Sequence, residues 1–269
     1  MGFTPITGRG IIPVDSCPIA LPAISDFIPR LKEEVLQKLE EKPKYKRANL
    51  TVRTGDDGRV RWGGIGRRSL RLDPEDNFFT ELNSRRIYYS LDTFFQANLS
   101  ILPGLITVLE QMPVWKDAVF FDLYGGVGLF SLALYDLCQR VVLVESSVHS
   151  ASIALYHKEL YGLDRLTILP VDVEALTPDS LTQAAGQAGT RVAMVDPPRA
   201  GLSGQAASHI LHLEGLDHLF YLSCHPESLK RDLDRLSACY QALSVTPLDF
   251  FPQTPHIETL VHFRRKYRN

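Results

Sequence analysis

The spacing of hydrophobic residues changes along the chain. Apolar side chains between positions 23 and 40 recur at the three- and four-residue spacing of an amphipathic helix, and Pro43 follows the last of them. Residues 48–53 and 59–62 then alternate apolar and polar side chains around a Gly-Asp-Asp-Gly turn, which is typical of a β-hairpin. The pattern predicts a small α+β domain over residues 1–91.

From residue 92 onward, short apolar strands alternate with helical segments, as in a doubly wound parallel sheet. The expected strands are residues 119–123, 141–144, 166–169, 192–195 and 219–222. The last apolar segment, 259–263, follows residues 243–245 after a loop rather than a helix, so we expect an antiparallel strand inserted at the sheet edge. Residues 92–269 are therefore predicted to form one α/β domain with a seven-stranded sheet.

The composition is that of an ordinary globular protein. The 269 residues are 45% hydrophobic and 22% charged, with a formal net charge of −2. The start of the chain lacks a basic segment followed by an apolar run, and no stretch approaches the roughly 20 apolar residues that cross a bilayer. We therefore expect a cytoplasmic protein with no membrane partner, and we expect it to be a monomer.

Positive charge gathers in one segment despite the near-neutral total. Residues 42–71 contain ten basic residues against two acidic ones, a net +8. The basic residues are Lys42, Lys44, Lys46, Arg47, Arg53, Arg59, Arg61, Arg67, Arg68 and Arg71. This asymmetry predicts a surface that binds the phosphates of RNA, although a solvated hairpin face has the same composition. Arg264, Arg265 and Lys266 are the alternative place for that contact.

A glycine-rich turn follows the first strand of the predicted sheet. In the segment from Asp122 to Gly128, which reads Asp-Leu-Tyr-Gly-Gly-Val-Gly, glycines let the backbone approach a ligand and turn into a helix. Counting from Gly126, the third glycine of a dinucleotide-binding fingerprint is replaced by Ser131. An NAD-dependent enzyme is therefore disfavoured.

Carboxylates end the next three strands. Glu145 stands 19 residues after Gly126, where it can bind both hydroxyls of an adenosine ribose, or it is a solvent-facing strand end. Asp172 lies within reach of an adenine amino group, or it caps the following helix. Asp196 begins an Asp-Pro-Pro-Arg turn whose rigid backbone exposes carbonyls to a substrate base, unless the prolines are mere punctuation.

The fifth strand ends at Cys224, which places a thiol at the same sheet edge as the acids. Cys138 and Cys239 stand in apolar helical contexts and fit the usual role of a free cysteine as a small buried hydrophobe. Methylation of uracil C5 requires a thiolate that adds to C6 and a base that later removes the C5 proton. Glu258 and His256, before the last strand, are both candidate bases, and the chemistry alone does not choose between them.

Five motifs in this order resemble the uracil-C5 RNA methyltransferases, which form 5-methyluridine in transfer and ribosomal RNA. They are Thr-Phe-Phe-Gln-Ala-Asn from Thr93, the glycine-rich loop, Asp-Pro-Pro-Arg-Ala-Gly-Leu from Asp196, Tyr-Leu-Ser-Cys-x-Pro-x-Ser-Leu from Tyr221, and Phe-Pro-Gln-Thr-x-His-x-Glu from Phe251. The resemblance covers about residues 88–265. It implies a Rossmann-like S-adenosylmethionine methyltransferase sheet and an RNA substrate, either tRNA or rRNA.

The resemblance also implies roles for individual residues. Cys224 is the expected nucleophile, and Glu258, in preference to His256, is the expected proton-abstracting base. The residues expected to bind the cofactor or line the pocket shared with the target base are Gln96, Tyr124, Gly126, Glu145, Asp172 and Asp196.

The chain departs from the family pattern at several places. His225 stands where the family usually has Asn, and Leu129 replaces the Asn that ends the glycine-rich loop. Members commonly begin with an oligonucleotide-binding barrel, for which we see no sequence pattern here. Some hold an iron-sulfur cluster through four cysteines. Cys17 resembles the last of those ligands but lacks its three partners, so we expect no metal cluster.

Two other functions compete with uridine C5 methylation. An enzyme that methylates an exocyclic amino group also uses an acid followed by two prolines, but it needs neither Cys224 nor Glu258. A non-catalytic RNA-binding relative is the second alternative. The presence of both reacting residues argues against it.

Overall fold

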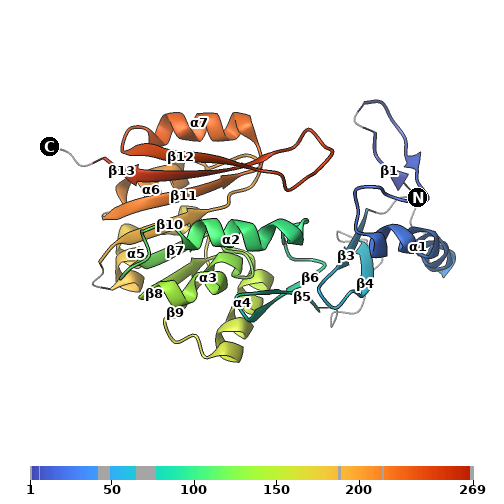
Figure 1. The fold of residues 1–269 in the computed structure, drawn as a ribbon, viewed down its shortest axis with the longest axis horizontal. Helices are drawn as coiled ribbons and strands as arrows, with labels where there is room; N and C mark the ends of the chain where they lie inside the picture. The colour runs from blue at the N-terminus through green and yellow to red at the C-terminus, as the bar shows by residue number, and fades with distance from the viewer. Residues whose placement is uncertain are drawn as a thin grey trace. The chain divides into compact units, whose positions relative to one another are not determined.

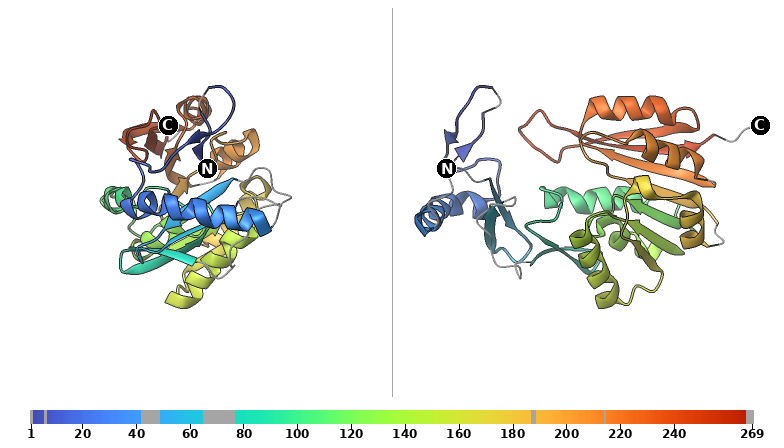
Figure 2. Two further views of the ribbon diagram at one scale, coloured as in Figure 1. Left: turned by 90° about the vertical axis from the view of Figure 1, so that its right-hand side faces the viewer. Right: turned by 180° about the vertical axis from the view of Figure 1, so that it is seen from behind.

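In the computed structural model, the predicted N-terminal helix is α1 (Pro22–Glu41), followed by the hairpin of β3 (Leu50–Thr54) and β4 (Val60–Gly64). Both predictions are confirmed. Leu31 of α1 and Trp62 of β4 are buried against each other and against further apolar side chains of the helix and of β3. The Trp62 indole N–H donates to Glu34 Oε2 at 2.7 Å, so its one polar group is satisfied. Figure 2 (left) shows α1 with this hairpin.

The structure describes residues 2–5, 7–41, 49–64, 77–186, 189–213 and 215–266. The chain divides into two units, each described here by itself. The first is Met1–Thr80 with Tyr88–Asp92, and the second is Glu81–Ile87 with Thr93–Asn269. The hairpin of β5 (Asn77–Leu82) and β6 (Arg85–Ser90) contributes to both, and β1 (Gly2–Phe3) pairs with β2 (Ile12–Pro13) in the first.

The second unit contains a seven-stranded sheet in the order β12-β13-β11-β10-β7-β8-β9, as Figure 1 shows. Its strands are β7 (Val119–Leu123), β8 (Arg140–Val144), β9 (Leu166–Leu169), β10 (Arg191–Val195), β11 (Leu216–Ser223), β12 (Tyr240–Leu248) and β13 (Glu258–Arg265). The five strands from β7 to β11 pair in parallel. The predicted seven-stranded Rossmann-like sheet is therefore confirmed. The strand order reverses between β7 and β10, and this is where ligands bind in such sheets.

The last strand is antiparallel, as predicted, but its predicted place at the sheet edge is wrong. β13 pairs with β11 on one side and with β12 on the other, so β12 is the edge strand. The two strands differ in burial: most of β13 is buried, whereas five of the nine residues of β12 are exposed. Pro247 also suits an edge, because proline cannot donate to a second neighbouring strand.

Helices lie along both sides of the sheet (Figures 1 and 2). They are α2 (Leu102–Glu110), α3 (Leu129–Ala133), α4 (Val148–Tyr161), α5 (Pro178–Ala185), α6 (Gly204–His212) and α7 (Pro226–Leu236), with short 3-10 turns η1 (Leu99–Ile101), η2 (Tyr135–Leu137) and η3 (Val173–Ala175). Ser147 and Ser203 cap the starts of α4 and α6 through their side chains. Among the described residues, no helix combines the length and apolarity needed to cross a bilayer.

Candidate active site

The pairing of β11 with β13 brings Cys224 and Glu258 together at the end of the sheet where the parallel strands have their carboxyl ends. Ser223 at the end of β11 pairs with Thr259 in β13, so the next residue beyond that pair is Cys224 on one strand and Glu258 on the other. Val195 of β10 pairs with Tyr221 of β11, so the residue that follows β10 emerges at the same edge. The structure therefore gathers the predicted nucleophile and base at the carboxyl ends of the parallel strands, together with Asp196.

Asp122 connects the end of β7 to α3, the helix that follows the glycine-rich loop. Its buried Oδ2 accepts hydrogen bonds from the Ser131 backbone N–H at 2.9 Å and from the Ser131 hydroxyl at 2.7 Å. Ser131 thus has its own function at the position where a dinucleotide site has glycine. Burial raises the pKa of Asp122 to about 6, and the hydrogen bonds from Ser131 oppose that rise. Gly126 and Gly128 have φ of 57° and 95°, a backbone conformation that favours glycine.

Glu145 ties the glycine-rich loop to the turn that begins α4. Its Oε2 accepts the Gly126 N–H at 2.9 Å, and its Oε1 accepts the Ser147 N–H at 2.6 Å. The side chain is therefore held by backbone donors at the end of β8, and each oxygen retains a further lone pair. This placement fits the predicted ribose-binding position better than a free solvent-facing strand end.

Two other predicted pocket residues differ in burial. Tyr124 begins the glycine-rich loop with φ of 62°, and its half-buried hydroxyl has a raised pKa because of burial. Asp172 is exposed at the end of β9 and occupies the cap position of η3, but its side chain makes no capping hydrogen bond there. The capping alternative therefore gains no support, and the carboxylate faces solvent.

Gln96 and Asp196 meet although they are 100 residues apart. The Gln96 side-chain amide donates to Asp196 Oδ2 at 3.0 Å, and Gln96 is buried. The pKa of Asp196 lies well above its ordinary value, first because of burial and then because the carboxylates of Glu258 and Asp122 are near. Burial therefore makes the ionised form of Asp196 less favourable than that of an exposed aspartate.

Glu258 is a buried carboxyl group without a compensating partner for one of its oxygens. The residue is 5% exposed, and within the described residues its Oε2 has no hydrogen-bond partner. Burial raises its pKa from 4.5 to about 7. A carboxyl group with this pKa is suited to accept a proton near neutral pH.

The Cys224 thiol is partly buried beside these acids. Its pKa is raised by burial first and then by the charges of Glu258 and Asp196, while Arg199 opposes the rise. His256, the other candidate base, is exposed and lies edge-on to the Phe251 ring. Of the two base candidates, Glu258 is therefore the enclosed one.

The departures at positions 225 and 129 have structural explanations. His225 is the N-cap of α7: its Nδ1 accepts the Ser228 N–H at 3.4 Å, the capping bond that an Asn side chain also makes. Leu129 is the first residue of α3 and is buried in the apolar interior. Neither departure alters Cys224 or Glu258.

The other two cysteines of the second unit, Cys138 and Cys239, lie before β8 and β12, at the opposite end of the strands from Cys224. Cys138 is buried, and burial raises the pKa of its thiol to about 12, which suits an inert core residue. Cys17 is buried in the first unit, and Cys239 follows α7. In the described ranges, no group of three or more His, Cys, Asp or Glu side chains could hold a metal ion. The predicted lack of an iron-sulfur cluster stays a prediction.

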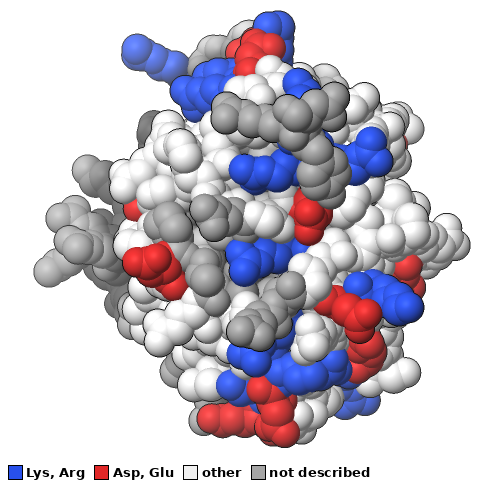
Figure 3. All heavy atoms as spheres, turned by 90° about the vertical axis from the view of Figure 1, so that its left-hand side faces the viewer, with Lys and Arg blue, Asp and Glu red and all other residues white. Residues whose placement is uncertain are grey.

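Seven of the ten basic residues in segment 42–71 lie outside the described residues, among them Arg67, Arg68 and Arg71. In the alternative basic set, Arg265 donates to the carbonyls of Leu211 and Leu213, and Lys266 donates to that of Ser237. These two cations therefore bind the chain itself. On the face at the left of Figure 1, basic side chains are interspersed with acidic ones rather than gathered (Figure 3). RNA contact by residues 1–91 stays a prediction.

Comparison with known proteins assigns the family. A family model described as tRNA (uracil-5-)-methyltransferase matches residues 68–266, more than half of the chain. The chain belongs to this family. The match includes the whole sheet and every residue predicted for the site. Sequence reasoning thus identified the family correctly from its motifs.

Individual relatives are longer than this chain. An uncharacterized RNA methyltransferase of Nanoarchaeum equitans is 33% identical over 180 residues, which cover 66% of this chain and 37% of the relative. The 23S rRNA (uracil(1939)-C(5))-methyltransferase of Klebsiella pneumoniae is 27% identical over 292 residues, which cover 99% of this chain and 66% of the relative. The chain therefore spans about a third to two thirds of the length of these curated relatives.

Solved structures share the fold. The tRNA (uracil-54, C5)-methyltransferase of Pyrococcus abyssi, in complex with S-adenosyl-L-homocysteine, matches with a TM-score of 0.70 at 20% identity, over 94% of this chain and 70% of the other. The tRNA m1G37 methyltransferase of M. jannaschii matches with a TM-score of 0.53 at 14% identity, over 88% of this chain and 68% of the other. The fold is thus shared by proteins named for different methylated bases.

Two buried acids that hydrogen-bond to the backbone near the site were not among the predicted site residues. Asp122 stands inside an apolar strand, and Asp232 stands in the helix after Cys224; both are essentially fully buried. An acid inside an apolar strand is the signal that could have singled out Asp122. Asp232 lies in a charged segment, where the sequence gives no comparable signal.

The raised pKa of Glu258 predicts how stability changes with pH. A carboxyl whose folded-state pKa is raised stabilises the fold fully below its ordinary pKa, here 4.5, and that stabilisation is lost as the pH rises through about 7. Glu258→Gln has no charge to bury. Its melting temperature should therefore exceed that of the wild type by more at pH 8 than at pH 5, with about 2–4 °C for each kcal/mol in a domain of this size.

Thermal unfolding followed by circular dichroism at the two pH values measures this difference. Glu159→Gln, at an exposed position of α4, is the matched control and should show no such gain. A Glu258→Gln variant whose advantage is the same at both pH values would mean that the buried carboxyl does not titrate as described.

Proposed function

We propose that this protein transfers a methyl group from S-adenosylmethionine to C5 of a uridine in RNA, through a covalent bond between Cys224 and C6 of the base. The observation that carries the proposal is the pairing of β11 with β13, which places Cys224 next to Glu258. Glu258 is buried there, and its Oε2 has no hydrogen-bond partner among the described residues. Family membership supports the reaction class. The reaction needs one thiol and one base, and this edge supplies both.

The carboxyl ends of β7 and β8 are the proposed cofactor site. The left-handed glycines of the loop leave backbone without side chains next to Glu145, whose oxygens can each accept another hydrogen bond. Glu145 would hold the ribose hydroxyls, while Tyr124, Gly126 and Asp172 would flank the rest of the nucleoside. When bound, S-adenosylmethionine supplies an electrophilic methyl group. The solved Pyrococcus abyssi relative is described in complex with S-adenosyl-L-homocysteine.

Cys224 and Glu258 divide the proposed chemistry. The Cys224 thiol gives its proton to water and its thiolate adds to C6, which places the electron pair on C5 and the adjoining carbonyl. C5 then takes the methyl group as the bond from that methyl to the cofactor sulfur breaks, which leaves S-adenosylhomocysteine. Glu258 removes the C5 proton, and the electron pair released expels the thiolate from C6. Asp196, held by the Gln96 amide, would lie beside the target base, and Gln96 would keep its carboxyl group in place.

The substrate proposed is a tRNA or an rRNA. Two matched proteins that are named for uracil methylation carry position 1939 of 23S rRNA and position 54 of tRNA in their names. Methylation of an exocyclic amino group is a weaker proposal, because that reaction uses neither the enclosed Glu258 nor the Cys224 thiol beside it. A non-catalytic RNA-binding role leaves them equally unexplained.

Cofactor binding should depend on Glu145. Glu145→Ala removes two charge-assisted acceptors, each worth about 1.5–3 kcal/mol, so affinity for S-adenosylhomocysteine should fall by tenfold or more. Isothermal titration calorimetry measures the dissociation constant. Asp164→Ala, which removes an exposed carboxylate in the turn after α4, should bind as the wild type does. Equal affinity in Glu145→Ala and wild type would place the ribose elsewhere.

Substitutions of the two reacting residues should have opposite effects on the covalent RNA complex. Cys224→Ala removes the atom that adds to C6, so neither 5-methyluridine nor a covalent RNA complex should form. Glu258→Gln permits addition and methyl transfer but slows proton removal by about 10²- to 10⁴-fold, so the methylated adduct should accumulate. A denaturing gel of each protein with candidate tRNA or rRNA and S-adenosylmethionine detects the adduct as a slower band.

RNA that contains 5-fluorouridine should trap the wild type in the same band, because the base cannot remove fluorine from C5. Cys239→Ala is the matched control and should form the adduct normally. A Cys224→Ala enzyme that makes 5-methyluridine at a rate near that of the wild type would refute the covalent mechanism.

A further inference from the structure

A buried carboxylate outside the reacting group connects the two segments that flank the thiol. Asp232 lies on α7 and is 0% exposed. Its Oδ2 accepts the Leu202 backbone N–H at 2.7 Å and the Tyr221 hydroxyl at 2.8 Å. Leu202 ends the loop that begins at Asp196, and Tyr221 stands three residues before Cys224 on β11. One oxygen atom therefore bonds both to the loop after β10 and to the strand that carries the nucleophile.

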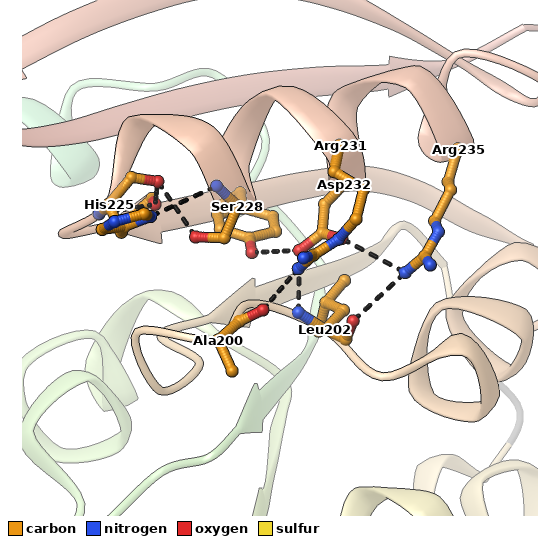
Figure 4. Close-up of polar contacts among 9 residues, drawn as sticks. Ala200, Leu202, His225, Ser228, Arg231, Asp232 and Arg235 are labelled. Atoms are coloured by element: carbon orange, nitrogen blue, oxygen red, sulfur yellow. Dashed lines mark hydrogen bonds and ion pairs between the residues drawn. The ribbon is translucent and has the colours of Figure 1, made fainter.

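Two arginines of the same helix complete the attachment of the loop, as Figure 4 shows. Arg231 donates to the carbonyl of Ala200, and Arg235 donates to the carbonyl of Leu202 at 3.2 Å. Both guanidinium groups lie 3.4 Å from Asp232 Oδ1, so the buried charge is compensated. The helix thus holds both the N–H and the C=O of Leu202, which leaves this end of the loop little freedom to shift.

Gly201 fits this attachment because it has no side chain. Its φ is +74°, and a Cβ atom built there would lie 2.4 Å from Asp232 Oδ2 and 2.8 Å from Arg231 Nη2. The backbone of the loop can approach the carboxylate this closely only at a glycine. The Ala-Gly-Leu sequence that follows the Asp-Pro-Pro-Arg turn is therefore shaped to meet Asp232.

The attachment bears on the distance between Asp196 and Cys224. Asp196 begins the loop that Asp232 holds, and Cys224 stands between Tyr221, which Asp232 binds, and Pro226, where α7 begins. The loop, the strand and the helix meet at one carboxylate, so a shift of Asp232 changes the position of Asp196 relative to the thiol. Asp122 lies on β7 and Glu145 follows β8. Their hydrogen bonds with Ser131 and Gly126 do not involve Asp232.

We propose that Asp232 is a positioning residue for methyl transfer: it fixes the Asp196 loop against the strand and helix that present Cys224. This rests on the proposed function, because it assigns a purpose to the geometry around that nucleophile. The carboxylate takes no part in bond making. Its loss should slow attack on the base and leave the cofactor site intact.

The test compares Asp232→Asn and Tyr221→Phe with the wild type and with Asp234→Asn. Asp234 is an exposed acid on the same helix that pairs with Lys230, so its variant is the matched control. The Asn amide oxygen can still accept from Leu202 and Tyr221. The Asn NH2 group then faces the guanidinium groups of the two arginines, so that donors meet donors. For each protein we would measure kcat and KM with RNA, S-adenosylhomocysteine affinity, melting temperature and the rate of adduct formation with 5-fluorouridine RNA.

In Asp232→Asn, kcat and the adduct rate should fall by about tenfold to 10²-fold, because a misplacement near 1 Å at a reacting centre has this effect. Affinity for S-adenosylhomocysteine should stay within about twofold of the wild type when both are folded, a split that general loss of structure does not produce. Tyr221→Phe should lower the rate of adduct formation less than Asp232→Asn does. In the double variant, Tyr221→Phe should lower that rate by a smaller factor than it does in the wild-type background.

The outcomes separate the two proposals. If the wild type forms neither 5-methyluridine nor an adduct, the proposed function fails. If the wild type is active and folded Asp232→Asn matches it, or loses cofactor affinity in parallel with kcat, the positioning role is overturned while the function stands. Should Asp232→Asn not fold, Tyr221→Phe decides: an adduct rate equal to that of the wild type contradicts the proposal.

Discussion

Burial of the Glu258 carboxyl beside Asp196 is the constraint on which the site depends. Burial raises the pKa of Glu258, and the pKa of Asp196 is raised by burial and then by the nearby charges of Glu258 and Asp122. The sheet enforces this arrangement, because β13 inserts between β11 and β12 and so carries Glu258 into the interior. An edge position for β13 would leave the same carboxyl hydrated, with an ordinary pKa and little use as a base near neutral pH.

The two halves of the site are held by different means. On the proposed cofactor side, Glu145 accepts the N–H groups of Gly126 and Ser147, and Asp122 accepts that of Ser131 in α3. On the proposed side of the target base, side chains of α7 bind the backbone of the loop that follows β10. The first half is therefore fixed by strands next to the strand-order reversal, and the second depends on how one helix packs. A substitution on α7 can thus disturb the chemistry without disturbing the cofactor.

The sequence was sufficient for features that depend on local pattern. Strand periodicity placed Cys224 and the acids at strand ends, and the antiparallel direction of β13 followed from its loop connection. Its interior position could not be inferred, because hydrogen-bond partners of a strand are set by the whole sheet. The contact of Asp232 with Leu202 and Tyr221 was invisible for the same reason: residues 30 and 11 positions away meet only in the folded protein. At Asp172, local pattern suggested a cap whose hydrogen bond the side chain does not make.

Transfer of a methyl group to uridine C5 must replace the hydrogen on that carbon, and this gives the most direct measurement. Candidate RNA is labelled with tritium at C5 of its uridines and incubated with the protein and S-adenosylmethionine. Methylation of C5 through Cys224 predicts that tritium appears in water in proportion to the methyl groups gained by the RNA, and that no release beyond background occurs with Cys224→Ala. RNA that gains methyl groups while it keeps its tritium would contradict C5 methylation and favour methylation at another atom.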